Sequence, residues 1–144
     1  MNVQAAGLTT VLKVKQFQEK AAQKELADKK VTREAEEQRL GQLEQSKESA
    51  LDQATVSGRT RVADMQTSVA FIQSLTRQIS QQGDRVDAAK QSEDEKRGEL
   101  VERSRSRQMV EKLDAQRKAE QEKEAEKKSQ KIIDVLAQRM KMGI

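Results

Sequence analysis

Hydrophobic residues are sparse along this chain and fall mostly at helical spacing. Good helix formers such as Ala, Glu, Lys, Gln and Arg fill the sequence, and there is no proline. One break stands out at Ala54 to Arg61, where poor helix formers follow one another and Gly58 can take a positive φ without strain. The pattern therefore predicts a helix over about 8–53, a turn over about 54–61 and a helix over about 62–142.

Helices this long and this polar need a partner, and folding back at the break supplies one. We expect an all-α fold in which two long helices form an antiparallel coiled-coil hairpin, helix two longer than helix one, as a single domain over 1–144. A turn centred near Gly58 brings together residues whose numbers total about 117. The large apolar residues match in this register: Leu51 with Met65, Leu43 with Ile72, Val31 with Val86, Phe17 with Leu100 and Leu8 with Met109.

The most apolar stretch, Val69 to Ile79, opens the second helix and does not fit on one helical face. One row of this helix has the 3-4 spacing of a coiled-coil seam: Ile72, Thr76, Ile79 and Gly83. The next row forms a stripe that we expect to be exposed: Phe71, Leu75, Gln78 and Gln82. Packing at the edge of the hairpin is the alternative for this stripe.

The end of the second helix reaches beyond the first helix from about residue 113. Between Asp114 and Lys131 nothing apolar is larger than Ala, and Glu–Lys pairs at i, i+4 spacing such as Glu124 with Lys128 support an isolated helix. Apolar residues then return: Ile132, Ile133, Val135, Leu136, Met140 and Met142. This amphipathic end either packs on the N-terminal residues Val3 to Val14 or docks into a partner groove.

Composition excludes most chemistry. Cysteine and histidine are both absent, which removes disulfides, zinc sites and Cys or His nucleophiles. The six glycines stand singly, so no phosphate-binding loop is present. We expect no enzyme, no cofactor and no metal. Low hydrophobicity with high charge is also typical of disorder, but helix propensity and heptad spacing favour long helices.

Charge and hydropathy limit the classes of partner that this chain can bind. The net charge is +4, with a local basic excess at Lys96 to Arg107 that either meets phosphates or an acidic protein, or forms an ordinary solvated helix face. Mixed charge and the lack of nearby aromatic residues argue against nucleic acid. No apolar run is long enough to span a bilayer, and the N-terminus lacks the pattern of a signal peptide. We therefore expect a cytoplasmic protein without direct membrane insertion.

Four stretches, in order along the chain, resemble the FliJ family, the small coiled-coil components of the flagellar export apparatus that are related to injectisome stalk proteins of the YscO type. The first is VLKVKQFQEKAAQKELA, and the second is FIQSL at the start of the second helix. The third is LVERSRSRQMVEKL. The fourth is SQKIIDVLAQRM, in which Ser129 and Val135 replace acidic residues of the family pattern.

The resemblance implies a non-enzymatic stalk of the bacterial flagellar type III protein-export apparatus, with a part in flagellum biogenesis, motility and chemotaxis. Such a stalk inserts into a FliI-like ATPase ring, contacts the cytoplasmic part of a FlhA-like export gate and binds export chaperones. It is peripheral at the cytoplasmic side of the inner membrane through these partners. The family's gate contact falls here on Phe71, Leu75, Gln78 and Gln82. We assign the ATPase contact to the tail residues Ile132, Ile133, Val135, Leu136 and Met140.

Three alternatives remain at this point. An injectisome stalk of the YscO type has the same architecture. A self-associating structural scaffold predicts a stable dimer, whereas we expect a monomer when the protein is free. A basic rod that binds nucleic acid through Lys96 to Arg107 predicts salt-dependent binding of DNA.

Overall fold

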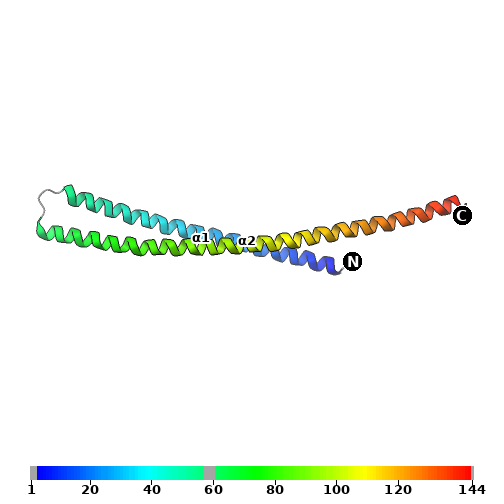
Figure 1. Ribbon diagram of the computed structural model, residues 1–144, viewed down its shortest axis with the longest axis horizontal. Coiled ribbons are helices and arrows are strands. Elements are labelled where there is room, and N and C mark those ends of the chain that lie inside the picture. Colours follow the sequence, from blue (N-terminus) through cyan, green and yellow to red (C-terminus); the bar gives the residue numbers. More distant parts are fainter. Residues whose placement is uncertain (1–2, 57–60, 144) are drawn as a thin grey trace. The chain divides into compact units, whose positions relative to one another are not determined.

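The computed structural model describes residues 3–56 and 61–143, and these residues form two helices. Helix α1 covers Val3–Val56 and helix α2 covers Val62–Lys141 (Figure 1). The predicted all-α antiparallel hairpin, with helix two longer than helix one, is confirmed. Helix α1 continues into the predicted turn as far as Val56, and the predicted turn centre at Gly58 lies outside the described residues.

Both helices run without a break because nothing in their interiors stops them. Glycines at positions 41, 83 and 98 lie within the helices and have open space around them, so each weakens its helix without interrupting it. Helix α2 has Asp64 in its first turn and Arg139 and Lys141 in its last, which complements the helix dipole. Its end is closed by Gly143, whose φ of 69° is a left-handed value that favours glycine.

Contacts divide the chain into two units, each with a stretch of α1 and a stretch of α2. The turn-side unit comprises Ala21–Leu100, and the terminal unit comprises Met1–Lys20 with Val101–Ile144. In the turn-side unit the two helices lie side by side (Figure 1). The expectation of a single domain stays a prediction.

The seam of the turn-side unit follows a strict heptad on both helices. Most buried and half-buried positions recur at alternating spacings of three and four residues, which is the pattern of a coiled coil. On α1 they are Ala22, Leu26, Lys29, Arg33, Glu36, Leu40, Leu43, Lys47 and Ala50. On α2 they are Ser68, Ile72, Leu75, Ile79, Gln82, Val86, Ala89, Glu93, Lys96 and Leu100.

The predicted register was wrong. Several residues that it placed in the seam are largely exposed, among them Phe17 at 74% and Val31 at 65%. Hydrogen-bonded and ionic pairs that join the helices have residue numbers that total from 118, for Glu36 with Gln82, to 127, for Glu37 with Lys90. The observed register therefore centres near a total of about 122, roughly five positions from the expected one.

The reason lies in the polar side chains of the seam. The prediction paired the large apolar residues of the two helices wherever they matched. The structure instead buries Arg33 and Glu93 together, and the backbone carbonyl of Glu36 accepts a hydrogen bond from Gln82 at 3.0 Å. The Arg33–Glu93 pair favours a register in which Val31 faces solvent while Val86 is only 4% exposed.

The two valines provide a direct check of the seam. Val86→Ala removes buried methyl groups, and we expect it to lower the free energy of unfolding by about 1–2 kcal/mol relative to Val31→Ala. Both substitutions raise helix propensity equally, so this contribution cancels in the comparison. Urea unfolding followed by circular dichroism measures the difference. Equal stability of the two variants would place both valines outside the seam.

Candidate partner-binding surfaces

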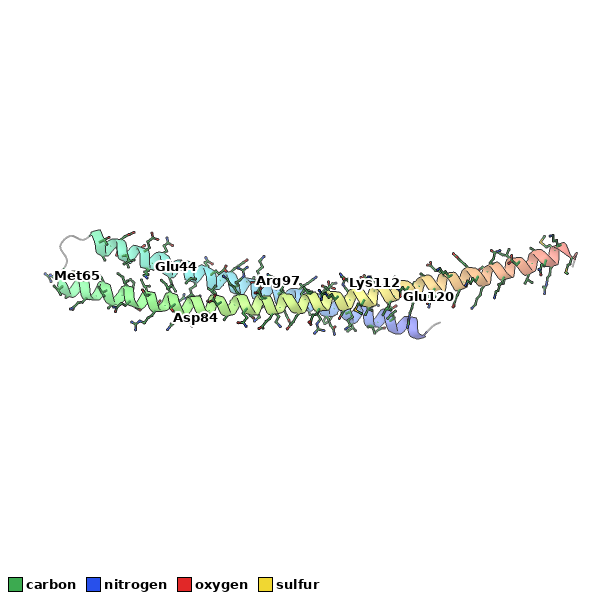
Figure 2. All side chains as sticks on the ribbon, viewed as in Figure 1. Glu44, Met65, Asp84, Arg97, Lys112 and Glu120 are labelled. Carbon is green, nitrogen blue, oxygen red and sulfur yellow. The ribbon has the colours of Figure 1, made fainter. Side chains whose placement is uncertain are left out.

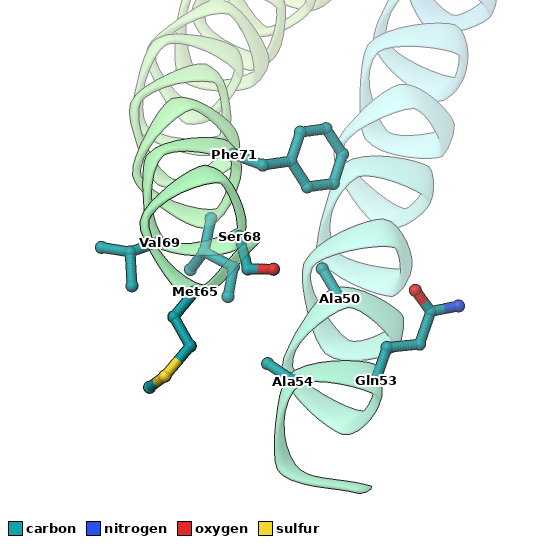
Figure 3. Close-up of a pocket in the computed structure, with 8 residues that line it drawn as sticks. Ala50, Gln53, Ala54, Met65, Ser68, Val69 and Phe71 are labelled. Atoms are coloured by element: carbon teal, nitrogen blue, oxygen red, sulfur yellow. The ribbon is translucent and has the colours of Figure 1, made fainter. Parts of the chain in front are cut away.

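A pocket of about 190 Å³ opens between the helices next to the turn. Figure 3 shows the Phe71 ring extending from α2 toward α1, with Ala50 and Ala54 on the facing side. The pocket exists because the seam runs out of large side chains here: α1 offers Ala50 and Ala54 and α2 offers Ser68. Side chains this short cannot fill the space between two helices. The residues that line the pocket are Ala50, Gln53, Ala54, Met65, Ser68, Val69, Phe71 and Ile72.

Large apolar side chains are exposed around this pocket. Phe71 is 54% exposed and Val62, at the start of α2, is 72% exposed. Exposed apolar residues gathered in one place mark interaction sites more often than isolated ones do. We call this surface the turn-end patch and define it by Val62, Met65, Val69 and Phe71.

The predicted exposed stripe was only half right. Phe71 and Gln78 are exposed, but Leu75 is 5% exposed and Gln82 is 3% exposed. Leu75 and Gln82 are therefore seam residues rather than members of an exposed stripe.

The predicted seam row of Ile72, Thr76, Ile79 and Gly83 must therefore be corrected as well. Thr76 is exposed, and its hydroxyl donates to the carbonyl of Ile72 in its own helix at 2.8 Å. Two rows share Ile72 and Ile79, one with Leu75 and Gln82 and the other with Thr76 and Gly83. Burying the first row removes more apolar area from water, and the Gln82 amide finds partners on Glu36.

The C-terminal segment, residues 115–143, is exposed at every position. Figure 2 shows its side chains, Glu120 among them, projecting from a single helix. Its large apolar residues are 50% to 83% exposed, so they are not packed on α1, and the alternative of local packing was wrong. The exposed apolar residues are Ile132, Ile133, Val135, Leu136, Met140 and Met142.

Part of the basic stretch from Lys96 to Arg107 is paired with carboxylates of the hairpin. Lys96 bonds to Glu25 on α1 at 3.1 Å and to Glu99 at 3.3 Å, and these carboxylates raise the pKa of Lys96 above its ordinary value. The stabilisation that they give is present at neutral pH and is lost only as pH rises through that raised pKa. Arg107 joins Glu19, which raises its pKa as well. Lys96 and Arg107 therefore join the two helices, which accounts for part of the positive charge of this stretch.

One ionic cluster lies inside the seam of the turn-side unit. The carboxylate of Glu93, a residue only 5% exposed, accepts hydrogen bonds from Arg33 on α1 and from Arg97 on α2, the latter at 3.1 Å. Arg33 also donates to Glu37 at 2.9 Å. Hydrogen bonding to Glu93 is the main cause that raises the pKa of Arg33. Charges on both helices are thus tied to a single buried carboxylate.

The described residues contain no group of three or more metal-ligating side chains, and within residues 3–56 and 61–143 neither helix is apolar and long enough to cross a membrane. A family model described as the flagellar FliJ protein matches residues 4–142. The chain belongs to the FliJ family. FliJ proteins are components of the flagellar protein-export apparatus and are export stalk proteins, not enzymes. Searches of curated proteins and of solved structures found no significant match.

The FliJ match spans both exposed apolar surfaces. The sequence predicted the C-terminal segment and Phe71 but missed the rest of the turn-end patch, including Met65 and Val69. A signal for them was present, since large apolar residues crowd the first turns of the second helix while the facing stretch of the first helix ends in alanines.

Removing the Arg33 guanidinium leaves the buried Glu93 carboxylate with Arg97 alone. Because a buried charge that loses a partner is destabilising, we expect Arg33→Ala to lower the melting temperature by several degrees. Arg39→Ala, at an exposed position of the same helix, should leave it nearly unchanged. Thermal unfolding followed by circular dichroism compares the two. Equal melting temperatures would show that the Glu93 cluster contributes nothing to stability.

Proposed function

We propose that this chain is the stalk that couples the flagellar export ATPase to the export gate. The observation that carries the proposal is that one two-helix chain presents two unpartnered apolar surfaces in two different units. The turn-end patch belongs to the turn-side unit and the C-terminal segment belongs to the terminal unit. A coupling protein needs two such surfaces, because it must hold two partners at once.

The ATPase side of the proposal is the C-terminal segment. Its apolar residues Ile132, Ile133, Val135, Leu136 and Met140 offer a face for a FliI-like ring. The charges before them have mixed sign, with four glutamates between 120 and 126 followed by lysines at 127, 128 and 131. A mixed-charge helix with a short apolar end binds weakly per residue, which suits a shaft that must not be held fast by one ring subunit.

The gate side of the proposal is the turn-end patch around Phe71. The half-exposed ring at the mouth of the pocket is an aromatic anchor of the kind that dominates protein interfaces. Gln78 is exposed two turns further along α2 and extends the contact surface. Leu75 and Gln82 contribute indirectly, because their contacts in the seam hold this stretch of α2 in place beneath the contact surface. The partner is the cytoplasmic part of a FlhA-like gate protein.

The family relationship supports the remaining parts of the proposal. Export chaperones are a third class of partner. The protein works at the cytoplasmic side of the inner membrane, reaches the membrane through its partners and is a monomer when free. Neither coupling nor chaperone binding requires a cofactor or a catalytic residue of this chain.

Phe71→Ala tests the gate contact. Burying the exposed half of a Phe contributes about 1–1.5 kcal/mol, so we expect the Kd for a purified gate fragment to rise about tenfold. Helicity and the melting temperature should stay close to those of the unmodified chain. Calorimetric titration measures the affinity.

Two control variants make this experiment decisive. Val31→Ala removes an exposed side chain of the same unit outside the patch, and gate affinity should be unchanged. Leu75→Ala removes a buried side chain and should lower stability by about 2–3 kcal/mol. Gate binding by Phe71→Ala at unmodified affinity would contradict the proposed contact.

Ile132→Gln combined with Leu136→Gln tests the ATPase contact. Loss of two exposed aliphatic side chains should weaken binding to the purified ATPase at least tenfold while gate binding is kept. The matched control is Lys127→Gln with Lys131→Gln, which places the same residue at neighbouring polar positions. If only the lysine variant loses affinity, charge rather than the apolar face makes the contact and the assignment is wrong.

A further inference from the structure

The seam of the turn-side unit mixes apolar residues with charged ones, and few of the apolar residues are fully buried. Among the described residues of this unit, only Ala22, Leu75 and Val86 are buried and apolar. Lys29, Arg33, Glu36, Lys47, Glu93 and Lys96 occupy other heptad positions. A seam of this kind specifies register weakly through packing, because charged residues interrupt its apolar positions.

In the observed register, with totals near 122, Leu43 lies opposite Ile79 and Ala50 lies opposite Ile72. The pockets agree with this alignment: Leu43 lines one with Gln78 and Gln82, which flank Ile79, and Ala50 lines another with Ile72. Leu40 then faces the polar Gln82, and Lys47 faces Leu75. Two of the aliphatic side chains in this stretch are therefore paired with polar ones.

A slip of half a heptad matches the same seam differently. Both helices keep a strict 3-4 pattern, so moving one along the other by about 5 Å brings every seam position opposite another seam position. Leu43 would then face Leu75, and Leu40 would face Ile79. The slipped register pairs Leu40 and Leu75 with aliphatic side chains but moves Ile72 from Ala50 to Lys47, so apolar matching separates the two registers only weakly.

Ion pairs favour the observed register. Arg33 bonds to Glu93, and Lys90 bonds to Glu37. In both pairs the α2 residue lies C-terminal to the α2 residue that is directly opposite its α1 partner. The slip would move these partners a further 5 Å or so apart and break both pairs. The bond from Gln82 to Glu36 has the opposite displacement, so the slip would bring its two residues level and preserve it.

We propose that the hairpin is a two-register device, in which ion pairs hold the observed register and apolar matching distinguishes it only weakly from a register slipped by half a heptad. The slip changes which residues of α1 lie beside the turn-end pocket. A force or a partner at one unit can thereby alter the surface presented by α2 near Phe71. The two registers are a property of the isolated chain and do not rest on the proposed partners.

Cysteine pairs in the full-length chain report the two registers, and the absence of native cysteine keeps the measurement clean. Leu43→Cys with Ile79→Cys reports the observed register, and Leu43→Cys with Leu75→Cys reports the slipped one. Leu43→Cys with Gln82→Cys is the control, because Gln82 lies one turn from Ile79 on the other side and shares a pocket with Leu43. Effective concentrations for intramolecular disulfide formation are measured in a glutathione buffer.

We expect the slipped pair to come within about tenfold of the observed pair and to exceed the control pair by about tenfold or more. A slipped pair that forms no better than the control would overturn the proposal, since local fluctuation alone would serve both equally. Disulfides between chains instead of within them would overturn it as well.

Salt and two further substitutions test whether the ion pairs select the observed register. Raising the salt from about 0.05 M to 1 M screens the ion pairs and should shift the ratio of slipped to observed pair upward at least about threefold. Arg33→Ala should do the same. Lys90→Ala changes an exposed side chain, and it replaces Arg33→Ala in this test if Arg33→Ala loses helicity. A ratio that responds to neither salt nor Lys90→Ala would show that ion pairs do not select the register.

Discussion

Association of the two helices depends on a narrow seam in which charged and polar residues interrupt the apolar ones. The charged seam residues contribute their aliphatic stems to the interface and carry their charges toward its edge, where a partner on the other helix meets them. Such contacts depend on the register of the two helices, because a carboxylate and a guanidinium bond only when they lie within reach of each other. Apolar contacts are less demanding. The polar residues therefore set the alignment of the two helices, while the apolar ones supply most of the free energy of their association.

The hairpin itself could be predicted from the sequence because it rests on local signals. Absence of proline, strong helix formers and one cluster of breakers are enough for two helices of unequal length. The exposed C-terminal segment could be predicted for a similar reason, since a helix that outreaches its partner has nothing to pack on. The match to the FliJ family over 4–142 agrees with the resemblance drawn from four short stretches.

Alignment of the two helices could not be predicted, because heptad patterns repeat. Apolar matches occur in more than one register, and two rows of α2 share Ile72 and Ile79. Choosing between Leu75 and Thr76 needed two facts from three dimensions: that Thr76 satisfies its hydroxyl within its own helix, and that Gln82 reaches Glu36. The turn-end pocket was missed for the same reason, since it arises where short side chains of distant sequence positions face one another.

The bare helix at the end of α2 has a kinetic consequence. Residues 115–143 are held by bonds within their own helix, such as the one from Gln130 to Asp134 at 3.0 Å, and gain nothing from burial. Amide protons there exchange through local opening, at a small fraction of the free energy that protects the seam. A partner that bound this segment would also suppress its local opening, so part of the binding free energy would go into holding the helix closed.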